Sequence, residues 1–297
     1  MGRRVSPHAA RAAGASAGEG TLNTVLITGC SSGIGLDAAR TLGRRGWRVF
    51  ATCRREEDCE RLRDEGLESF PLDYGDTASV EAAVAEALSR SDGALDAVFN
   101  NGALAIPAAV EDLGRDALDA IFQVNLFGPH EVVRRVLPAM RARGRGRIVN
   151  CSSVLGFAAI PFSGAYTATK HAMEGLTDTL RLELRGTHIE VSLILPGPIH
   201  GTPLHEKALA HIERWIDDEG SVWREFYESK MKPRMASENP SRAPFSLGPE
   251  AVTAKLVHAL ESPRPRARYY VTRMAHVARF LRTFGPPRLR DAVAARL

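Results

Sequence analysis

The sequence predicts an α/β fold, a doubly wound parallel sheet with helices on both of its faces. Two observations lead to this prediction. Short apolar runs rich in β-branched residues alternate along the chain with longer stretches in which apolar residues recur at helical spacing. Glycine-rich, proline-rich and polar segments follow several of the short runs, which is where sheets of this kind bind their ligands. Strands that are separated by helices are joined by right-handed crossovers, so they become parallel neighbours.

Length and composition limit the classes of protein to which the chain can belong. Its 297 residues are enough for one large α/β domain with a full core, or for two small domains. The formal net charge of +4 is a modest basic excess that does not by itself indicate a nucleic-acid partner, and we expect none. There is no run of about 18 or more apolar residues that could span a membrane.

The cysteines predict the redox compartment. Cys30, Cys53, Cys59 and Cys151 show neither a CxxC pair nor the spacing of metal ligands, and no secretory signal is present. We therefore expect reduced thiols in a cytoplasmic protein, and no metal site.

Residues 1–23 are predicted to form a disordered arm. They are rich in Ala, Gly, Ser and Arg, Glu19 is their only acid, and their apolar residues show no periodicity. Low acid content and several arginines are also typical of a transit peptide, but the weak amphipathic pattern makes that the second interpretation.

The first ordered element is predicted to be a strand at residues 24–28, followed by a glycine-rich turn and a helix that runs through Leu42. These three elements together form a phosphate cradle, because backbone N–H groups and the helix dipole point at the anion and glycine lets the backbone approach it. Gly29, Gly33 and Gly35 have the spacing Gly-x-x-x-Gly-x-Gly rather than the common Gly-x-Gly-x-x-Gly. An ordinary glycine-rich loop is the alternative, which the strand before it and the helix after it disfavour.

The alternation of strands and helices continues to residue 195. Asp73, Asn100, Ser153 and the turn at Pro196 each follow a strand, so we expect them to gather with the glycine-rich turn at the carboxyl edge of the sheet. The predicted strands are residues 48–52, 68–72, 97–100, 147–152 and 190–195, and the predicted helices are residues 56–65, 77–89, 112–143 with an interruption at Gly128-Pro129, and 166–184.

Tyr166 and Lys170 carry the candidate chemistry. Ser163 is expected to cap the long helix that contains both, and residues four apart lie on one helix face, one turn apart. A phenol with a pKa near ~10 is a poor acid–base group at neutral pH, and lowering that pKa to about 7 requires roughly 4 kcal/mol. A cation at about 4 Å supplies about that much at an effective dielectric of ~20. Alone, the pair is better explained as surface side chains, because Tyr-x-x-x-Lys is common.

The pair does not stand alone, because with its other motifs the chain resembles the short-chain dehydrogenase/reductase family, in its shorter, single-domain branch. The resemblance runs from about residue 24 to 199 and, more loosely, to 272. It implies a single Rossmann-type sheet of about seven strands in one catalytic domain at residues 24–272. Further segments resemble the type 1 17β-hydroxysteroid-dehydrogenase-like group and, equally, bacterial NADP-dependent aldehyde reductases of that group. The family motifs are Thr28-Gly-x-x-x-Gly-Ile-Gly35, Asp73, Asn100-Asn-Gly-Ala103, Asn125, Ser153, Tyr166-x-x-x-Lys170 and Pro196-Gly-Pro-Ile199.

The resemblance implies roles for four residues. Tyr166 would give a proton to a substrate carbonyl or take one from an alcohol, and Ser153 would hydrogen-bond that oxygen. Lys170 would lower the pKa of the tyrosine and hold the nicotinamide ribose. Asn125 resembles the family asparagine that supports a water-linked proton relay with the lysine. A chain with these residues is expected to interconvert a carbonyl and its alcohol.

The resemblance also implies which residues bind a nicotinamide dinucleotide. Asp73 would meet the adenine, and Ile199 and Thr202 would border the nicotinamide. Two departures from the family pattern affect this set: Asn-Asn-Gly-Ala replaces the usual Asn-Asn-Ala-Gly, and an extra residue precedes Thr202. His200 faces either substrate or solvent, and the solvated loop is the favoured interpretation. The expected cofactor-binding residues are Thr28, Gly29, Ser31, Ser32, Gly33, Ile34, Gly35, Arg54, Asp73, Asn100, Gly102, Tyr166, Lys170, Pro196, Gly197, Ile199 and Thr202.

Charge at the end of the second strand predicts NADP rather than NAD. NAD-preferring members place Asp or Glu there, where it binds the ribose 2′-OH. This chain has Cys53 instead, followed by Arg54 and Arg55, with no carboxylate. A guanidinium matches a phosphate dianion in charge and geometry, so we expect Arg54 to contact the 2′-phosphate. The alternative is that both arginines are only solvated.

Residues 202–248 are predicted to form a helical lid over the substrate, and residues 154–160 a second apolar wall. Plain core packing is the alternative, and it accounts for some of these side chains. A pocket of this composition suits a small apolar carbonyl or alcohol, such as a long-chain aldehyde, a retinoid or a steroid, and nothing in the sequence separates these. The apolar residues of the lid are Leu204, Ile212, Trp215, Ile216, Trp223, Phe226 and Tyr227.

Residues 273–297 are predicted to form a basic amphipathic tail. From Pro263 to Leu297 nine arginines stand against Asp291 alone, a local net charge of +8. Such a helix suits weak contact with an anionic membrane surface, at which a cytoplasmic enzyme would be peripheral. A helix that closes the substrate pocket or contacts another subunit is at least as good an interpretation. The apolar residues at helical spacing are Met274, Val277, Ala278, Leu281 and Phe284, opposite Arg279 and Arg282.

Two classes of function fit the sequence. A catalytically idle protein that senses NADP or serves as a scaffold could use the same fold, because a fold alone does not define function. Such proteins usually lose part of the set Asn125, Ser153, Tyr166 and Lys170, which is complete here, so the enzyme is favoured. By analogy with families of this kind we expect a homo-oligomer.

Overall fold

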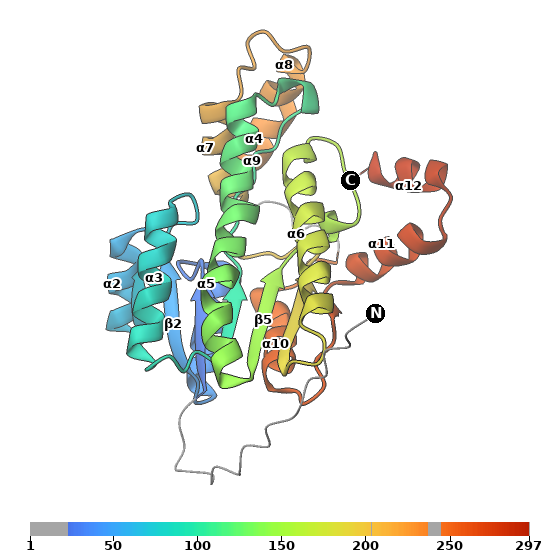
Figure 1. Cartoon of the computed structure of the whole chain (residues 1–297). Helices are drawn as coiled ribbons and strands as arrows, with labels where there is room; N and C mark the ends of the chain where they lie inside the picture. Colours follow the sequence, from blue (N-terminus) through green and yellow to red (C-terminus); the bar gives the residue numbers. More distant parts are fainter. Residues whose placement is uncertain (1–22, 203, 237–244, 297) are drawn as a thin grey trace, which may run out of the picture.

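The fold is a seven-stranded parallel sheet with the strand order β3-β2-β1-β4-β5-β6-β7 (Figure 1). The order reverses between β1 and β4, so the sheet is doubly wound, as the sequence predicts. The computed structural model describes residues 23–202, 204–236 and 245–296. The strands are β1 (Thr24–Thr28), β2 (Arg48–Cys53), β3 (Glu68–Pro71), β4 (Ala97–Asn100), β5 (Gly146–Cys151), β6 (Ile189–Leu195) and β7 (Arg268–Tyr270).

Two layers of helices enclose the sheet, and each layer has its own buried apolar core. Val25 and Ile27 of β1 belong to one core, and Leu26 between them belongs to the other, because successive strand residues point to opposite faces. Covering both faces explains why every residue of β1 is buried. One layer consists of α1 (Gly33–Arg44), α2 (Glu56–Asp64) and α10 (Pro249–Glu261), and the other of α3 (Thr77–Arg90), α5 (Gly128–Arg143) and α6 (Gly164–Glu183) (Figure 1).

A third apolar cluster lies beyond the carboxyl ends of the strands and contains much of the predicted lid. Ile212, Ile216 and Tyr227 are buried in it. The hydroxyl of Tyr227 donates to Oδ2 of Asp112 (2.6 Å) and accepts from the backbone N–H of Ala109 (2.8 Å). These three side chains therefore pack as core. The elements of this region are α4 (Arg115–Phe122), α7 (Leu204–Trp215), α8 (Arg224–Phe226), a π-helical turn at Tyr227–Met231, and α9 (Lys232–Ala236).

One prediction about helix boundaries is wrong, and a second is right in position only. Gly128-Pro129 does not interrupt the chain's path, because α4 runs through a π-helical turn, η2 (Gln123–Phe127), directly into α5. Pro129 lies in the first turn of α5, where proline is tolerated. Ser163 occupies the N-cap position of α6, but its side chain makes no capping hydrogen bond. Its φ of −126° and ψ of 21° differ from the extended conformation from which a capping side chain reaches the first N–H groups.

The structure describes the C-terminal end of the chain up to residue 296, whereas its description of the N-terminal end begins at residue 23. The predicted arm lies outside the described residues except for Asn23, and residues 237–244 of the predicted lid lie outside them too. At the other end α11 (Arg273–Phe284) and α12 (Pro287–Ala294) stand apart from the two helix layers in Figure 1. No helix within the described ranges is long and apolar enough to cross a bilayer.

Candidate active site

Tyr166 and Lys170 lie in the first half of α6, next to Ser153 at the end of β5. The side chain of Lys170 is 1% exposed, and its ammonium donates to the carbonyl oxygen of Cys151 (2.8 Å), which fixes the helix against the strand end. Nζ of Lys170 lies 5.4 Å from the centroid of the Tyr166 ring. Oγ of Ser153 accepts from the backbone N–H of Leu155 (3.1 Å), and Ser153 is near enough to the phenol to lower its pKa. The three residues therefore meet at the carboxyl edge of the sheet.

The pKa of Tyr166 differs from the sequence-based expectation. Burial raises it above the ordinary value for a phenol, the nearby thiol of Cys151 adds to the rise, and the hydroxyl of Ser153 offsets only part. Burial also lowers the pKa of Lys170, whose ammonium points at a backbone carbonyl. The lowering of this pKa by Lys170 stays a prediction, because in this structure the ammonium is directed at Cys151. The phenol is protonated at neutral pH.

Asn125 lies in the π-helical turn η2 and is fully buried. Its side chain accepts from the backbone N–H of Leu104 (2.7 Å) and donates to the carbonyl of Leu104 (2.8 Å) and to Oγ1 of Thr169 (3.1 Å). Thr169 directly precedes Lys170, so Asn125 ties the loop after β4 to the helix of Tyr166 and Lys170. Single π-helical turns within helices are frequent at functional sites.

The turn between β1 and α1 has the backbone that a phosphate cradle requires. Gly29 and Gly33 have positive φ angles of 71° and 56°. A Cβ atom on Gly35 would lie 2.3 Å from the carbonyl oxygen of Gly29, so a side chain there would disrupt the turn. Ser32 at the N-cap of α1 makes no side-chain hydrogen bond to the first helical turn, whose N–H groups are thus left for an anion. The turn fits a dinucleotide pyrophosphate, and it holds Thr28, Gly29, Ser31, Ser32, Gly33, Ile34 and Gly35.

A chain of buried hydrogen bonds links this turn to α6. Oγ1 of Thr28 lies 2.7 Å from the hydroxyl of Tyr74, which donates to Oδ1 of Asn100 (2.8 Å). Nδ2 of Asn100 donates to Oδ1 of Asn150 (2.8 Å), and Nδ2 of Asn150 donates to Oγ1 of Thr177 in α6 (2.9 Å). Burial raises the pKa of Tyr74, so its hydroxyl keeps its proton. A satisfied buried network of this kind is rigid, and it fixes the cradle relative to Lys170.

Tyr74 is a residue that the sequence analysis missed. A Cβ atom on Gly102 would lie 2.9 Å from Cε2 of Tyr74, and one on Gly128 would lie 2.5 Å from Cβ of Tyr74. The tyrosine ring therefore explains the order Asn-Asn-Gly-Ala, because an alanine at position 102 would collide with it. The only signal in the sequence was its place after Asp73, at the carboxyl end of β3. Oδ1 of Asp73 accepts from the backbone N–H of Gly75 (2.9 Å).

Three arginines lie around the glycine-rich turn and the end of β2. Arg54 and Arg55 are exposed, and Arg55 pairs with Asp58 (3.3 Å). Arg54 makes no ion pair with the residues that the structure describes. Arg61 of α2, which the sequence analysis missed, donates to the carbonyl oxygen of Ser31 (2.7 Å). This border of the site is positively charged.

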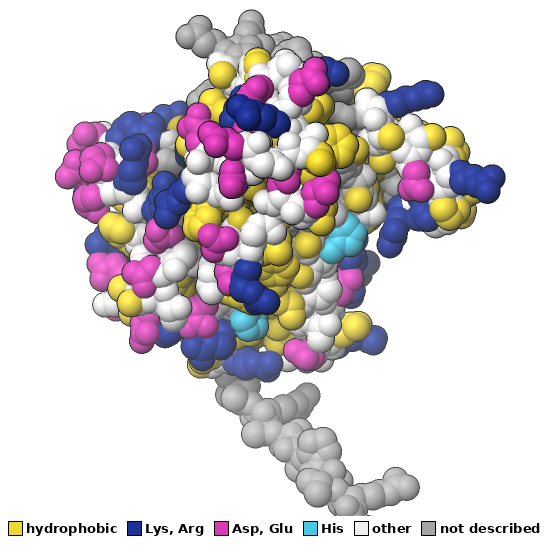
Figure 2. Space-filling model, turned by 90° about the horizontal axis from the view of Figure 1, so that it is seen from above, with side chains coloured by type: hydrophobic (Ala, Val, Ile, Leu, Met, Phe, Trp, Pro, Cys, Tyr) yellow, Lys and Arg dark blue, Asp and Glu magenta, His cyan; other side chains and the backbone are white. Residues whose placement is uncertain are grey.

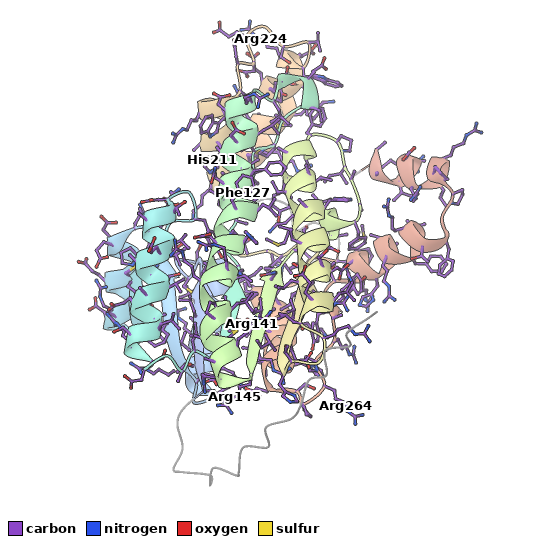
Figure 3. The ribbon with its side chains drawn as sticks, in the orientation of Figure 1. Phe127, Arg141, Arg145, His211, Arg224 and Arg264 are labelled. Atoms are coloured by element: carbon purple, nitrogen blue, oxygen red, sulfur yellow. The ribbon has the colours of Figure 1, made fainter. Side chains whose placement is uncertain are left out.

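The helix α7 adds basic side chains to the same border. Burial lowers the pKa of His211, and the charges of Arg54, Arg214 and Lys207 lower it further. Its imidazole is therefore neutral at pH 7. In Figure 3 His211 lies above the sheet, whereas Arg145 lies at the opposite end of the strands.

The turn after β6 is packed between β5 and the C-terminal segment. The carbonyl oxygen of Pro196 accepts from the backbone N–H of Val154 (2.7 Å). A Cβ atom on Gly197 would lie 2.1 Å from Oγ1 of Thr272, so only glycine fits there. This turn therefore lies beside Ser153.

Thr202 reaches the glycine-rich turn despite the extra residue before it. A Cβ atom on Gly33 would lie 2.9 Å from Cγ2 of Thr202. Ile199 is half-buried against the core of α1 and α10. His200, expected to be solvated, is half-buried, with Nδ1 3.4 Å from Oγ of Ser246.

One turn beyond Lys170, the buried Glu174 forms a polar support that the sequence analysis missed. The hydroxyl of Ser152 donates to its Oε1 (2.9 Å), and Arg268 of β7 donates to its Oε2 (3.2 Å). Burial raises the pKa of Glu174, and its charge favours the ammonium of Lys170. From sequence alone a glutamate in a helix looks solvated, so no signal distinguished it.

One apolar hollow lies near the N-terminal end of α6, beside a cluster of aromatic side chains. Phe162 stacks on Phe226 at 4.3 Å and meets the edge of Trp223 at 5.1 Å, both from the predicted lid. A hollow of about 640 Å³ lies elsewhere, around Arg185 and His188 at the far end of α6. The hollow beside the aromatic cluster has about 600 Å³ and is lined by Ala109, Val110, Glu111, Pro161, Phe162 and Trp223.

Comparison with known proteins defines the class to which this fold and site belong. Residues 23–213 match the model of the short chain dehydrogenases, and the chain belongs to the short-chain dehydrogenase/reductase family, whose members are oxidoreductases. It is 39% identical over 271 residues to the uncharacterized oxidoreductase YbbO of Escherichia coli, covering 91% of this chain and 93% of that protein. It is 34% identical over 265 residues to human 17-beta-hydroxysteroid dehydrogenase type 1 (84% and 77%), and 32% over 256 residues to human retinol dehydrogenase 8 (82% and 80%).

Solved structures share the fold. A short-chain dehydrogenase from Streptomyces avermitilis has a TM-score of 0.72 at 26% identity, covering 88% of this chain and 91% of that one. An actinorhodin polyketide ketoreductase with NADPH has a TM-score of 0.67 at 29% identity (84% and 95%). A short-chain dehydrogenase/reductase from Burkholderia phymatum in complex with NAD has a TM-score of 0.70 at 25% identity (84% and 88%). The predicted Rossmann-type sheet is confirmed, and a nicotinamide dinucleotide is supported as the cofactor.

Proposed function

We propose that this protein is an NADP(H)-dependent oxidoreductase that interconverts an apolar aldehyde or ketone and its alcohol, with Tyr166 as the acid and base. The observation that carries the proposal is the meeting of a protonated, half-buried phenol with Ser153 and Lys170 at the edge of the sheet where the glycine-rich turn lies. A proton donor beside a cradle for a dinucleotide is what carbonyl reduction requires.

Each residue has a distinct task in the proposed reaction. The cofactor, when bound, supplies a hydride to the substrate carbon or accepts one from it. Ser153 orients the substrate oxygen by a hydrogen bond, and Tyr166 gives that oxygen its proton. Lys170 then stabilises the phenolate that remains, since its ammonium carries further N–H donors besides the one directed at Cys151. Asn125 acts as a positioning residue through Thr169.

The choice of NADP rests on the charge around the cradle. The residues directly after β2 are Arg54 and Arg55 rather than a carboxylate, Arg54 is free of ion pairs with the described residues, and Arg61 is anchored nearby on Ser31. An exposed guanidinium at this position suits the 2′-phosphate, and an acidic residue there would repel it. Proteins of similar structure carry either cofactor, so the selectivity must come from these side chains.

The apolar class of substrate rests on the aromatic hollow. Trp223 and Phe226 pack on Phe162, which lies two residues before α6, and the first turn of α6 carries Tyr166. The printed names of two relatives refer to a steroid and to retinol, which are large apolar molecules. An aldehyde or ketone with an extended hydrocarbon part is therefore the substrate class that we propose.

The test is NADPH consumption with a panel of apolar aldehydes and ketones, for the native protein and for Tyr166→Phe. The variant should lose about 10²-fold or more in kcat while NADPH still binds, because the ring stays and only the transferable proton goes. Tyr269→Phe is the matched control, because Tyr269 lies in β7 and its hydroxyl bonds to His258 and to the backbone N–H of Arg266.

Two outcomes would contradict the proposal. A near-normal kcat in Tyr166→Phe would remove the tyrosine from the reaction. NADPH binding with no consumption on any member of the panel would favour the idle, cofactor-sensing protein instead.

A further inference from the structure

The C-terminal helix pair, α11 and α12, presents an apolar surface to solvent. Val277, Phe280 and Phe284 of α11 recur at i, i+3 and i+7, so they lie on one face of the helix. Phe280 and Phe284 are 62% and 73% exposed, and their rings lie 5.3 Å apart. Leu289 of α12 is also exposed. Exposed aromatic rings at this density mark a surface that has a partner.

The opposite face of α11 already has its partner within the domain. Ala275 is buried, and Met274 and Leu281 are half-buried. The guanidinium of Arg279 lies 4.9 Å from the centroid of Tyr270 in β7. The apolar residues of this helix thus divide into an anchored set and a free set, and the free set is not needed to hold the helix in place.

The free apolar face is bordered by unpaired positive charge. Arg273 is four residues before Val277 and shares its side of the helix. The two helices contain five arginines and one acid, Asp291, and none of these arginines forms an ion pair with a described residue. Figure 2 shows hydrophobic and basic side chains next to one another at the right-hand end of the molecule, which is where this pair projects in Figure 1. The five arginines are Arg273, Arg279, Arg282, Arg288 and Arg290.

We infer that the C-terminal helix pair binds the surface of an anionic phospholipid bilayer. Aromatic side chains with adjacent arginines are what an interfacial helix requires: the rings enter the boundary between headgroups and acyl chains, and the guanidinium groups meet lipid phosphates. A second copy of this chain would bring the same positive charges together, because a twofold interface places identical surfaces against each other. Charge complementarity therefore favours lipid over self-association.

This surface is joined to the wall of the active site. Tyr270, beneath Arg279, meets the ring of Phe157 edge-on at 5.7 Å. Phe157 follows the short 3-10 helix Val154–Gly156, which begins directly after Ser153. Binding through Phe280 and Phe284 would therefore hold this side of the substrate wall close to the bilayer, where apolar molecules are dissolved.

The test is sedimentation of the full chain with vesicles of phosphatidylcholine alone and of phosphatidylcholine with phosphatidylglycerol. Binding should require the anionic lipid and should be strong in about 0.01 M salt and lost near 1 M, because the Debye length falls from about 30 Å to about 3 Å. Phe280→Ser and Phe284→Ser should each weaken partitioning into the vesicles roughly tenfold, since each variant loses an aromatic side chain that the bilayer would bury. Arg273→Gln should weaken it about fivefold at low salt.

Matched controls distinguish binding through this surface from non-specific binding to vesicles and from misfolding of the variants. Leu182→Ser removes a comparably exposed apolar side chain from α6, and Arg115→Gln removes an exposed arginine from the start of α4; both should bind like the native chain. Thermal unfolding checks that the variants are folded, and the readout is independent of turnover, so it does not depend on the proposed reaction. Failure of the native chain to sediment, or undiminished binding of the phenylalanine variants, overturns the inference. A change of oligomeric mass in Phe280→Ser or Phe284→Ser assigns the face to a second copy and overturns it too.

Discussion

Replacing Arg54 by alanine should remove much of the proposed preference for NADPH over NADH. Arg54 is exposed, follows β2 at the carboxyl edge of the sheet, and has no acidic partner among the described residues, so its guanidinium is available to a phosphate. A hydrogen bond to a charged group contributes about 1.5–3 kcal/mol, and exposure to solvent places this one at the lower end. Because ~1.4 kcal/mol is a factor of ten, Kd for NADPH should rise roughly tenfold, whereas Kd for NADH should change less than about twofold.

The assay is titration of the native chain and of the variant with both cofactors, followed by protein fluorescence or calorimetry. Arg55→Ala is the matched control, because Arg55 already pairs with Asp58 and its side chain is 67% exposed. It should leave the ratio of the two affinities nearly unchanged. The reasoning is refuted when Arg54→Ala weakens both cofactors equally, or when Arg55→Ala has the larger effect on the ratio.

Two further substitutions test how the cradle is held in place. Tyr74→Phe removes a buried hydroxyl that bonds to Thr28 and Asn100, so the free energy of unfolding should fall by ~1–3 kcal/mol, and KM for the cofactor should rise with little change in kcat. An unchanged denaturant midpoint would argue against this network. Gly35→Ala places Cβ 2.3 Å from the carbonyl oxygen of Gly29, and cofactor affinity should fall by about tenfold or more. Gly43→Ala in the same helix is its control, because its Cβ meets only Leu67 at 3.5 Å, and it should bind cofactor normally in the same titration.

The sequence predicts the sheet well because its signals are local. Strands β1 and β4 are predicted with their observed bounds, and β2, β3, β5 and β6 within one residue at either end, since each is an apolar run between a helix and a polar or glycine-rich segment. No range is predicted for the short strand β7. The glycine-rich turn is predictable for a related reason. Gly29, Gly33 and Gly35 are needed for the backbone itself, so their spacing is visible without knowledge of the rest of the fold.

Contacts between segments that are far apart in the chain could not be predicted from the sequence. Tyr74 and Arg61 belong to the site because β3 ends and α2 begins at the edge of the sheet where the glycine-rich turn lies, and neither residue has a local pattern that reveals this. Cys53 shows the same limit. Its side chain is only 1% exposed and packs in the core with Cys59, so an aspartate introduced there to favour NADH would also place a carboxylate in an apolar environment. Arg54 is therefore the cleaner test of cofactor choice.

The pKa of Tyr166 determines how the rates of reduction and of oxidation should depend on pH. Because burial raises that pKa, the phenol is protonated through the neutral range, which is the form that gives a proton to a carbonyl oxygen. The rate of NADPH-dependent reduction should therefore be flat around neutral pH and fall only in alkaline solution, as the phenol ionises. Oxidation of the alcohol needs the phenolate and should rise over the same alkaline range.

Profiles of kcat against pH in both directions measure this, with vesicle-free protein and saturating cofactor. A reduction rate that increases with pH through the neutral range would mean that Tyr166 does not supply the proton, whereas a rate that falls there would mean that cofactor binding draws Lys170 away from Cys151 and lowers the pKa of the phenol. Phe in place of Tyr166 separates these two cases, since only the second loses turnover.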